Sequence, residues 1–278
     1  REAALRVDED FPDDMTAKAV QVIRENKDHP FFLFHSLHDL HVPRLPNERF
    51  AGKTSRGPRG DAIVQMDWMV GAVIDELEML GIAENTLVIF TSDNGPVLDD
   101  GYSDQAVELI GGHSPSGPFR GGKYSAYEAG TRVPTIVYWP GTVAAGTSDA
   151  LLSQIDIYAS VAELAGVSLD GGEAIDSRSY IDAWLGRSGT GRELMLEESV
   201  GTLSLRNGSW KYISPYTGAS GLEWVADDKA IEGGFELQPQ LYDLSSDLGE
   251  QRNVSSEHPE LVSDMQAEIE RKVSDTNR

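Results

Sequence analysis

Residues Thr86 to Gly95, TLVIFTSDNG, join a short apolar run to two side chains that can bind a metal ion. The run ends at Phe90, is rich in β-branched and aromatic residues and has no helical period, which predicts a strand buried on both faces of a parallel sheet. Asp93 and Asn94 follow it, at the edge where open α/β sheets bind their ligands. Their oxygen atoms suit a hard cation such as Ca²⁺ or Mg²⁺. From this stretch alone, an Asp-Asn-Gly turn without a ligand is an equal alternative.

Further helices and strands are predicted around this stretch. Residues 14–26 and 61–80 have apolar side chains at helical spacing, and Gly81 follows the second helix where a glycine commonly ends one. Residues 30–34, PFFLF, and residues 132–140 predict two more buried strands. Helices that alternate with strands predict an α/β fold, in which helices flank a mostly parallel sheet with right-handed crossovers.

The sequence pattern changes near residue 187. Short apolar runs separated by Gly, Asn and Ser predict a small antiparallel sheet. A segment that starts at His258 has apolar residues four positions apart, which predicts a terminal helix. We therefore expect residues 1–186 to belong to an α/β core and residues 187–278 to form a small α+β subdomain.

The composition argues against several classes of protein. The net charge is −23, from 46 acidic and 23 basic residues, so the chain lacks the positive footprint that nucleic-acid binding needs. There is no cysteine, which excludes disulfides and thiolate metal sites within these residues. No stretch approaches the roughly 20 apolar residues that span a bilayer. The chain opens on Arg1 with neither an initiator Met nor a signal peptide, so we expect a natural start upstream.

A long connection, residues 96–127, follows the Asp-Asn-Gly segment and contains GGHSPSGPFRGGKYSAY. Connections of this length without secondary structure are usually functional or disordered. The pair Gly121-Gly122 lies between Arg120 and Lys123. A glycine pair next to cationic side chains favours a backbone that approaches an anion closely.

Taken together, these motifs resemble the sulfatases of the alkaline phosphatase superfamily. TLVIFTSDNG and RGGKYSAYEAGTRVPTIVYWPG resemble the second half of the sulfatase core, and FFLFHSLHDLHVPRLP resembles the family's histidine loop. SLRNGSWKYI and PQLYDLSSDLGEQRNV resemble the C-terminal subdomain. The resemblance spans nearly the whole chain, and the order of the Asp-Asn-Gly and Gly-Gly-Lys segments makes it specific.

The resemblance implies a role for four residues. Asp93 and Asn94 match metal ligands, normally for Ca²⁺, with Mg²⁺ as the alternative. Lys123 matches the lysine that holds the sulfate group. His41 matches the histidine that contacts the sulfate and protonates the leaving oxygen. These roles agree with the chemistry, because cleavage of a sulfate ester concentrates negative charge on the equatorial oxygens and on the departing oxygen.

Other polar residues of the two loops are weaker candidates. His113 and Arg120 are possible substrate contacts, with backbone shaping or solvent exposure as the equal alternative. His38 has a smaller claim, because most isolated histidines are structural or exposed. His35 follows a predicted buried strand, so we expect it to be a satisfied core group.

One large part of the family pattern is absent. Sulfatases carry a Cys or Ser in a C/S-x-P-x-R segment that is converted to formylglycine, the nucleophile, and their N-terminal half supplies two more metal aspartates and a Lys-x-His segment. This sequence has no Cys, and its one Ser-x-Pro-x-Arg match, residues 116–120, lies after the Asp-Asn-Gly motif, whereas the family's segment belongs to the N-terminal half. The resemblance therefore implies an incomplete alkaline-phosphatase-like core that exposes apolar surface, binds metal weakly by itself and needs its missing N-terminal half or an equivalent partner.

We therefore predict the hydrolysis of sulfate esters on a sulfated saccharide or an aryl sulfate, with the nucleophile outside this chain. One alternative is a phosphodiesterase or phosphonate monoester hydrolase of the same superfamily, although the Gly-Gly-Lys loop favours sulfate. Another is a non-catalytic fragment that binds a sulfated ligand. The resemblance also implies a periplasmic or secreted protein. We expect the partner to be a sulfated small molecule or glycan. We expect neither nucleic-acid binding nor a membrane span.

Overall fold

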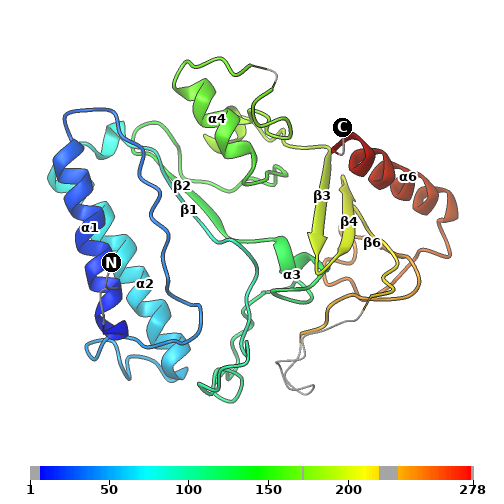
Figure 1. Ribbon diagram of the computed structural model, residues 1–278, viewed down its shortest axis with the longest axis horizontal. Coiled ribbons are helices and arrows are strands. Elements are labelled where there is room, and N and C mark those ends of the chain that lie inside the picture. The colour runs from blue at the N-terminus through cyan, green and yellow to red at the C-terminus, as the bar shows by residue number, and fades with distance from the viewer. Residues whose placement is uncertain (1–6, 171, 219–230, 277–278) are drawn as a thin grey trace, which may run out of the picture. The chain divides into compact units, whose positions relative to one another are not determined.

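A computed structural model of the chain describes residues 7–170, 172–218 and 231–276. The chain, drawn in Figure 1, forms two compact units. The described part of unit 1 comprises residues 7–87 and 97–114, and that of unit 2 comprises residues 88–96, 115–170, 172–218 and 231–276. Within the described residues, no helix combines the length and the apolar character needed to cross a membrane.

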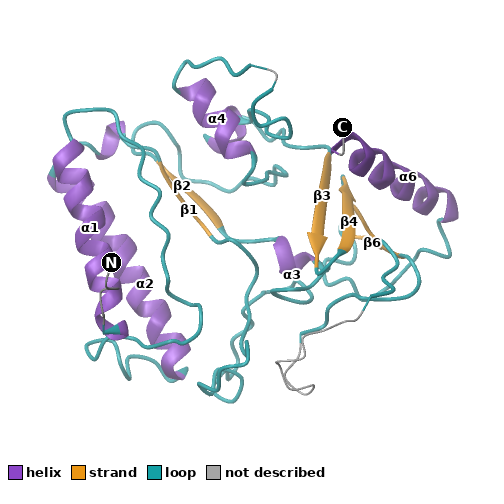
Figure 2. Cartoon of the chain, in the orientation of Figure 1, coloured by secondary structure: helices purple, strands orange, loops and turns teal. Residues whose placement is uncertain are grey.

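Unit 1 is built on two packed helices, α1 (Phe11–Asn26) and α2 (Gly57–Met79), with the short 3-10 helices η1 (Asp8–Asp10) and η2 (Ala83–Asn85) beside them. Figure 2 shows α1 and α2 lying side by side. Ile23 of α1 and Met69 and Leu77 of α2 are buried. The helical spacing in the sequence predicted both helices, and Gly81 adopts the positive φ of 69° that a residue after a helix end requires.

The strand predicted over residues 30–34 is wrong for the described structure. These residues have no regular secondary structure, and Phe32 and Phe34 are 76% and 81% exposed. An apolar run becomes a strand only when a hydrogen-bonded neighbour lies beside it. No partner strand lies beside these residues in the part of the chain that the structure describes.

The first sheet of unit 2 has two strands, β1 (Val88–Thr91) and β2 (Thr135–Tyr138), which pair antiparallel with Val88 opposite Tyr138. The prediction of a mostly parallel sheet is therefore wrong for the described strands. A short apolar run does not fix the direction of its neighbour. Here the long connection returns the chain in the opposite direction. The predicted burial on both faces is also wrong, because no residue of β1 or β2 is buried and Ile136 of β2 is 58% exposed. Three short helices complete this part, α3 (Glu128–Thr131), α4 (Asp156–Leu164) and α5 (Ile181–Trp184).

The second sheet of unit 2 confirms the predicted antiparallel sheet and terminal helix. Its strands follow the order β3 (Leu194–Ser199), β4 (Thr202–Asn207), β5 (Trp210–Ile213) and β6 (Gln240–Asp243), all antiparallel to their neighbours. Helix α6 (Pro259–Thr276) packs on one face through a buried cluster formed by Leu205, Tyr212, Leu241, Met265 and Ile269. The boundary after residue 186 stays a prediction.

Candidate active site

The segment after β1 presents oxygen atoms that suit a hard cation. The Asp93 Oδ1 atom accepts a hydrogen bond from the Asn94 backbone N–H at 2.9 Å, and the Asn94 Nδ2 atom donates to the Gly95 carbonyl at 2.8 Å. With its nitrogen used in this way, the Asn94 carboxamide offers its oxygen as the coordinating atom. Carboxylate and carboxamide oxygens are ligands that Ca²⁺ and Mg²⁺ prefer, so the donor chemistry fits.

These two residues do not by themselves make a complete metal site. Ca²⁺ takes six to eight oxygen ligands, and Asp93 and Asn94 supply only part of such a set. Over the described ranges, no group of three or more His, Cys, Asp or Glu side chains is placed to hold a metal ion. The remaining ligands of such an ion would therefore be water molecules or groups other than Asp93 and Asn94.

Gly95 fixes this segment against α3. Its backbone N–H donates to the Gly130 carbonyl at 2.9 Å. A Cβ atom built at Gly95 would lie 1.6 Å from the Ala129 carbonyl oxygen, a distance no side chain could tolerate. The glycine of the Asp-Asn-Gly motif is therefore required by a close backbone approach.

The lysine loop lies next to the same segment. The Lys123 backbone N–H donates to the Pro96 carbonyl at 2.9 Å, and a Cβ atom at Gly122 would meet that carbonyl oxygen at 2.4 Å. Gly121 has a positive φ of 84°, which glycine adopts readily. The Lys123 Nζ atom lies 4.9 Å from the centroid of the Tyr124 ring. The two motifs that are far apart in the sequence are thus adjacent through their backbones.

Arg120 is engaged inside unit 2. Its Nε atom donates to the Glu232 carboxylate, and one terminal nitrogen donates to the Glu250 carbonyl at 2.7 Å. The guanidinium carbon lies 4.1 Å from the centroid of the Tyr127 ring. These contacts fix the start of the lysine loop and occupy much of the side chain.

His41 lies in unit 1, where a hydrogen bond orients its ring. The Nδ1 atom lies 2.8 Å from the Val42 carbonyl oxygen, so Nδ1 carries the proton that is donated. The Nε2 atom lies 3.9 Å from the Asp100 Oδ2 atom. The His41 side chain is 61% exposed and that of Asp100 only 6%. An accessible imidazole with an oriented Nε2 atom can exchange a proton with a bound molecule.

Arg44 anchors the loop that carries Asp100. Its buried guanidinium donates to the Val97 carbonyl at 3.0 Å, to the Leu98 carbonyl at 3.1 Å and to the Asp104 carboxylate at 2.7 Å. Sequence reasoning singled out neither Arg44 nor Asp100. The available signals were an Asp-Asp pair shortly after the Asp-Asn-Gly motif and an arginine shortly after His41.

The other candidate histidines of unit 1, His113, His38 and His35, differ in their surroundings. The exposed His113 donates its backbone N–H to the Ile110 carbonyl at 3.2 Å. The His38 ring packs against Phe11 with centroids 5.4 Å apart. His35 is not the satisfied group that was expected, because its buried Nε2 atom lacks a hydrogen-bond partner among the described residues. Burial lowers the pKa of His35.

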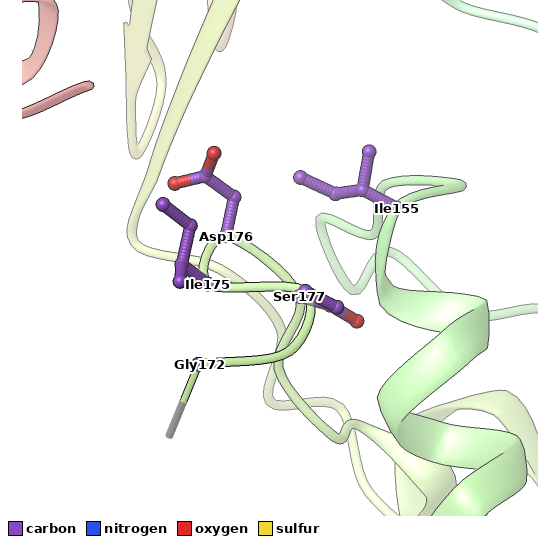
Figure 3. A pocket seen from close by; sticks show the side chains of 6 residues that line it. Ile155, Gly172, Ile175, Asp176 and Ser177 are labelled. Atoms are coloured by element: carbon purple, nitrogen blue, oxygen red, sulfur yellow. The ribbon is translucent and has the colours of Figure 1, made fainter. Parts of the chain in front are cut away.

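The structure places the candidate residues in two groups. His41 and His113 belong to unit 1, whereas Asp93, Asn94, Lys123 and Arg120 belong to unit 2. A cavity in unit 2 lies apart from the second group and is lined by Ile155, Gly172, Ala174, Ile175, Asp176 and Ser177 (Figure 3). None of the candidate residues lines it.

Comparison with known proteins gives a consistent result. The family model described as Sulfatase matches residues 3–167. The N-acetylgalactosamine-6-O-sulfatase of Bacteroides thetaiotaomicron is 47% identical over 269 residues, which cover 96% of this chain and 52% of that protein. Human arylsulfatase A is 33% identical over 254 residues, which cover 88% of this chain and 47% of that protein. The chain spans about half the length of these curated relatives.

Solved structures agree with the sequence matches. One solved structure, whose description concerns the metabolism of multiple glycosaminoglycans by Bacteroides thetaiotaomicron, is 46% identical to this chain and has a TM-score of 0.93. The match covers 99% of this chain and 56% of that one. The PsFucS1 sulfatase from Pseudoalteromonas sp. has 26% identity and a TM-score of 0.78, covering 99% of this chain and 55% of that one.

Proposed function

This chain belongs to the sulfatase family, and we propose that it is the C-terminal portion of an enzyme that hydrolyses sulfate esters on a sulfated glycan. The observation that carries the proposal is the hydrogen bond from the Lys123 N–H to the Pro96 carbonyl, which holds the lysine loop beside the Asp93-Asn94 segment. A lysine point charge beside the ligands of a hard cation suits the binding of a sulfuryl group. The N-acetylgalactosamine-6-O-sulfatase relative supports a saccharide as the substrate, with an aryl sulfate as the alternative.

In this proposal, each candidate residue has a distinct task. Asp93 and Asn94 hold Ca²⁺, or Mg²⁺, and such an ion when bound supplies positive charge for the sulfuryl oxygens. Lys123 binds an equatorial oxygen of the sulfate. In its doubly protonated form, His41 would donate the Nε2 proton to the leaving oxygen and return to the neutral ring, while Nδ1–H stays bonded to the Val42 carbonyl.

His113 and Arg120 are proposed as further substrate contacts. The internal hydrogen bonds of Arg120 leave it less able to follow a substrate, so we expect it to contribute less to binding than Lys123.

We place the nucleophile, a formylglycine, in a segment outside these residues. The chain has no Cys, and its one Ser-x-Pro-x-Arg match, residues 116–120, lies directly before the lysine loop and not in an N-terminal half. The half-length match to the relatives supports a nucleophile upstream of this chain. That upstream segment would cover Phe32 and Phe34, which are highly exposed in this chain. We also propose that residues 1–186 are part of the core, that residues 187–278 are the C-terminal subdomain, and that the complete protein is periplasmic or secreted.

The full-length natural protein provides the test. Its intact mass should reveal an upstream segment that contains a residue converted to formylglycine. It should hydrolyse an aryl sulfate, lose that activity with a chelator and regain it with added Ca²⁺, because Asp93 and Asn94 provide metal-dependent charge stabilisation. A phosphate diester of the same leaving group, assayed alongside, should give a lower kcat/KM.

Three outcomes would contradict parts of this proposal. A larger kcat/KM on the phosphate diester would favour the phosphodiesterase alternative. Affinity for a sulfated glycan with no product release would favour a non-catalytic binding protein. A natural polypeptide that begins near Arg1 would refute the placement of the nucleophile upstream.

A further inference from the structure

The short helix α3 connects the two halves of the candidate sulfate site in unit 2. The Gly130 carbonyl accepts the N–H of Gly95, directly after the proposed metal ligands. The Ala129 N–H donates to the Arg120 carbonyl at 3.0 Å, just before the glycine pair and Lys123. A rotation or shift of α3 would therefore move both the metal-ligand segment and the lysine loop.

Figure 1 shows α3 near the C-terminal sheet, and the carboxylate of Glu128 joins the two. Glu128 is buried, and its Oε1 atom accepts from the fully buried Lys211 of β5 at 3.0 Å. Its Oε2 atom accepts from Arg206 of β4 at 3.2 Å and from Arg132 at 3.1 Å. Both carboxylate oxygens are therefore bonded, which fixes the orientation of the carboxylate plane as well as its position.

Two further contacts hold the same region. The Glu128 backbone N–H donates to the Glu250 Oε2 atom at 2.7 Å. The hydroxyl of Ser199, the last residue of β3, donates to the Tyr124 carbonyl, directly after Lys123. Each contact joins the site region to a residue of the C-terminal part of unit 2.

A buried ion pair is a weak source of net stability, because desolvation offsets most of the Coulomb attraction. It does demand a specific geometry, since each charged atom must keep its partner. Burial alone would raise the pKa of Glu128, but Lys211 and Arg206 outweigh that effect and lower this pKa. Glu128 thus stays ionised and keeps its cationic partners at neutral pH.

We propose that Glu128 is a positioning residue, whose ion pairs with Lys211 and Arg206 set the placement of the Asp93-Asn94 segment relative to Lys123. This inference rests on the proposed function, because it assigns a role within that site. Glu128 itself touches neither sulfate nor metal. It acts through the backbone of α3.

The test is Glu128→Gln in the full-length natural protein, which keeps the side-chain size but removes the charge. The amide nitrogen would face Lys211 or a guanidinium, so α3 should shift. We expect kcat on an aryl sulfate to fall about 10- to 100-fold, as for sub-ångström misplacement of a reacting group. We also expect the calorimetric Kd for Ca²⁺ to rise about tenfold, as when the groups that support metal ligands are changed.

Glu197→Gln is the matched control. Glu197 accepts a hydrogen bond from the same Lys211 Nζ atom at 3.2 Å but lies on β3, outside α3. It should cost stability yet keep the wild-type kcat and Ca²⁺ affinity. The double variant Glu128→Gln with Lys211→Met removes the unpaired buried charge, so it should recover part of the lost Tm without recovering kcat.

A purely structural role would instead lower Tm and leave kcat and the Ca²⁺ Kd of the folded protein unchanged, and that result would overturn the inference. The design separates this failure from failure of the proposed function. A wild-type protein that cleaves no sulfate refutes the function, and the Ca²⁺ Kd of Glu128→Gln still decides the positioning role. A wild-type protein that binds neither Ca²⁺ nor Mg²⁺ overturns both.

Discussion

Glu250 is a carboxyl group buried among charged neighbours in unit 2. Burial raises its pKa to about 7, although Lys211 and Arg120 oppose the rise and Glu128 adds to it. In the unfolded chain the value is near 4.5. Between these values the folded state holds more protons than the unfolded state, so the stability linked to Glu250 is complete below pH 4.5 and is lost as the pH rises through about 7.

Glu250→Gln should remove this pH dependence. Each pKa unit corresponds to about 1.4 kcal/mol. The unfolding free energy of the variant minus that of the wild type should therefore increase by on the order of 2–3 kcal/mol from pH 5 to pH 8. Urea unfolding at several pH values would measure the difference. Glu48→Gln, in an exposed loop, is the control and should follow the wild type. Parallel curves for Glu250→Gln and the wild type would contradict the assignment.

Individual site residues differ in how far the sequence predicted them. The chemistry of Asp93, Asn94 and Lys123 was visible as local motifs, whereas the backbone hydrogen bond that joins Lys123 to Pro96, just after Asn94, was not. The supporting role of Glu128 was not visible, because its partner Lys211 lies 83 positions away and no local pattern connects the two. Long-range ion pairs of this kind depend on the tertiary structure.

At the level of elements, helices were predictable and strand partners were not. The spacing of apolar residues found α1, α2 and α6, since one helical face repeats within a continuous segment. The apolar runs located β1 and β2 but not their antiparallel pairing. The strand prediction for residues 30–34 was wrong for the same reason. A strand is defined by a hydrogen-bonded neighbour, which the local sequence does not specify.

The close approach of the β1-terminal segment to α3 gives a prediction at this level. Gly95→Ala would place a methyl group 1.6 Å from the Ala129 carbonyl oxygen, so the two segments must separate. We expect the unfolding free energy to fall by about 2–4 kcal/mol and Ca²⁺ binding to weaken. Gly71→Ala in α2 is the matched control, because a Cβ atom there meets nothing within 4 Å. That control should be neutral or slightly stabilising, as expected for alanine in a helix. Equal stabilities of the two variants would argue against the close approach.

For the whole molecule, the comparisons and the structure agree on the family and leave the complete enzyme as a proposal. The chain covers about half of the curated relatives, and its candidate residues fall into two units. The acidic composition means that an anionic substrate must be attracted by a local cationic group, since the net charge of −23 repels anions. In unit 2, the lysine loop beside the Asp93-Asn94 segment is the region best suited to provide that attraction.

The most direct test of this account is the kcat/KM of Lys123→Ala in the full-length natural protein, measured on an aryl sulfate with Ca²⁺ present. If Lys123 binds the sulfuryl group, kcat/KM should fall at least about 100-fold, the usual cost of removing a group that stabilises developing charge. Lys53→Ala, at an exposed loop lysine of unit 1, should retain wild-type kcat/KM. A Lys123→Ala variant as active as Lys53→Ala would remove Lys123 from the site and contradict the central claim.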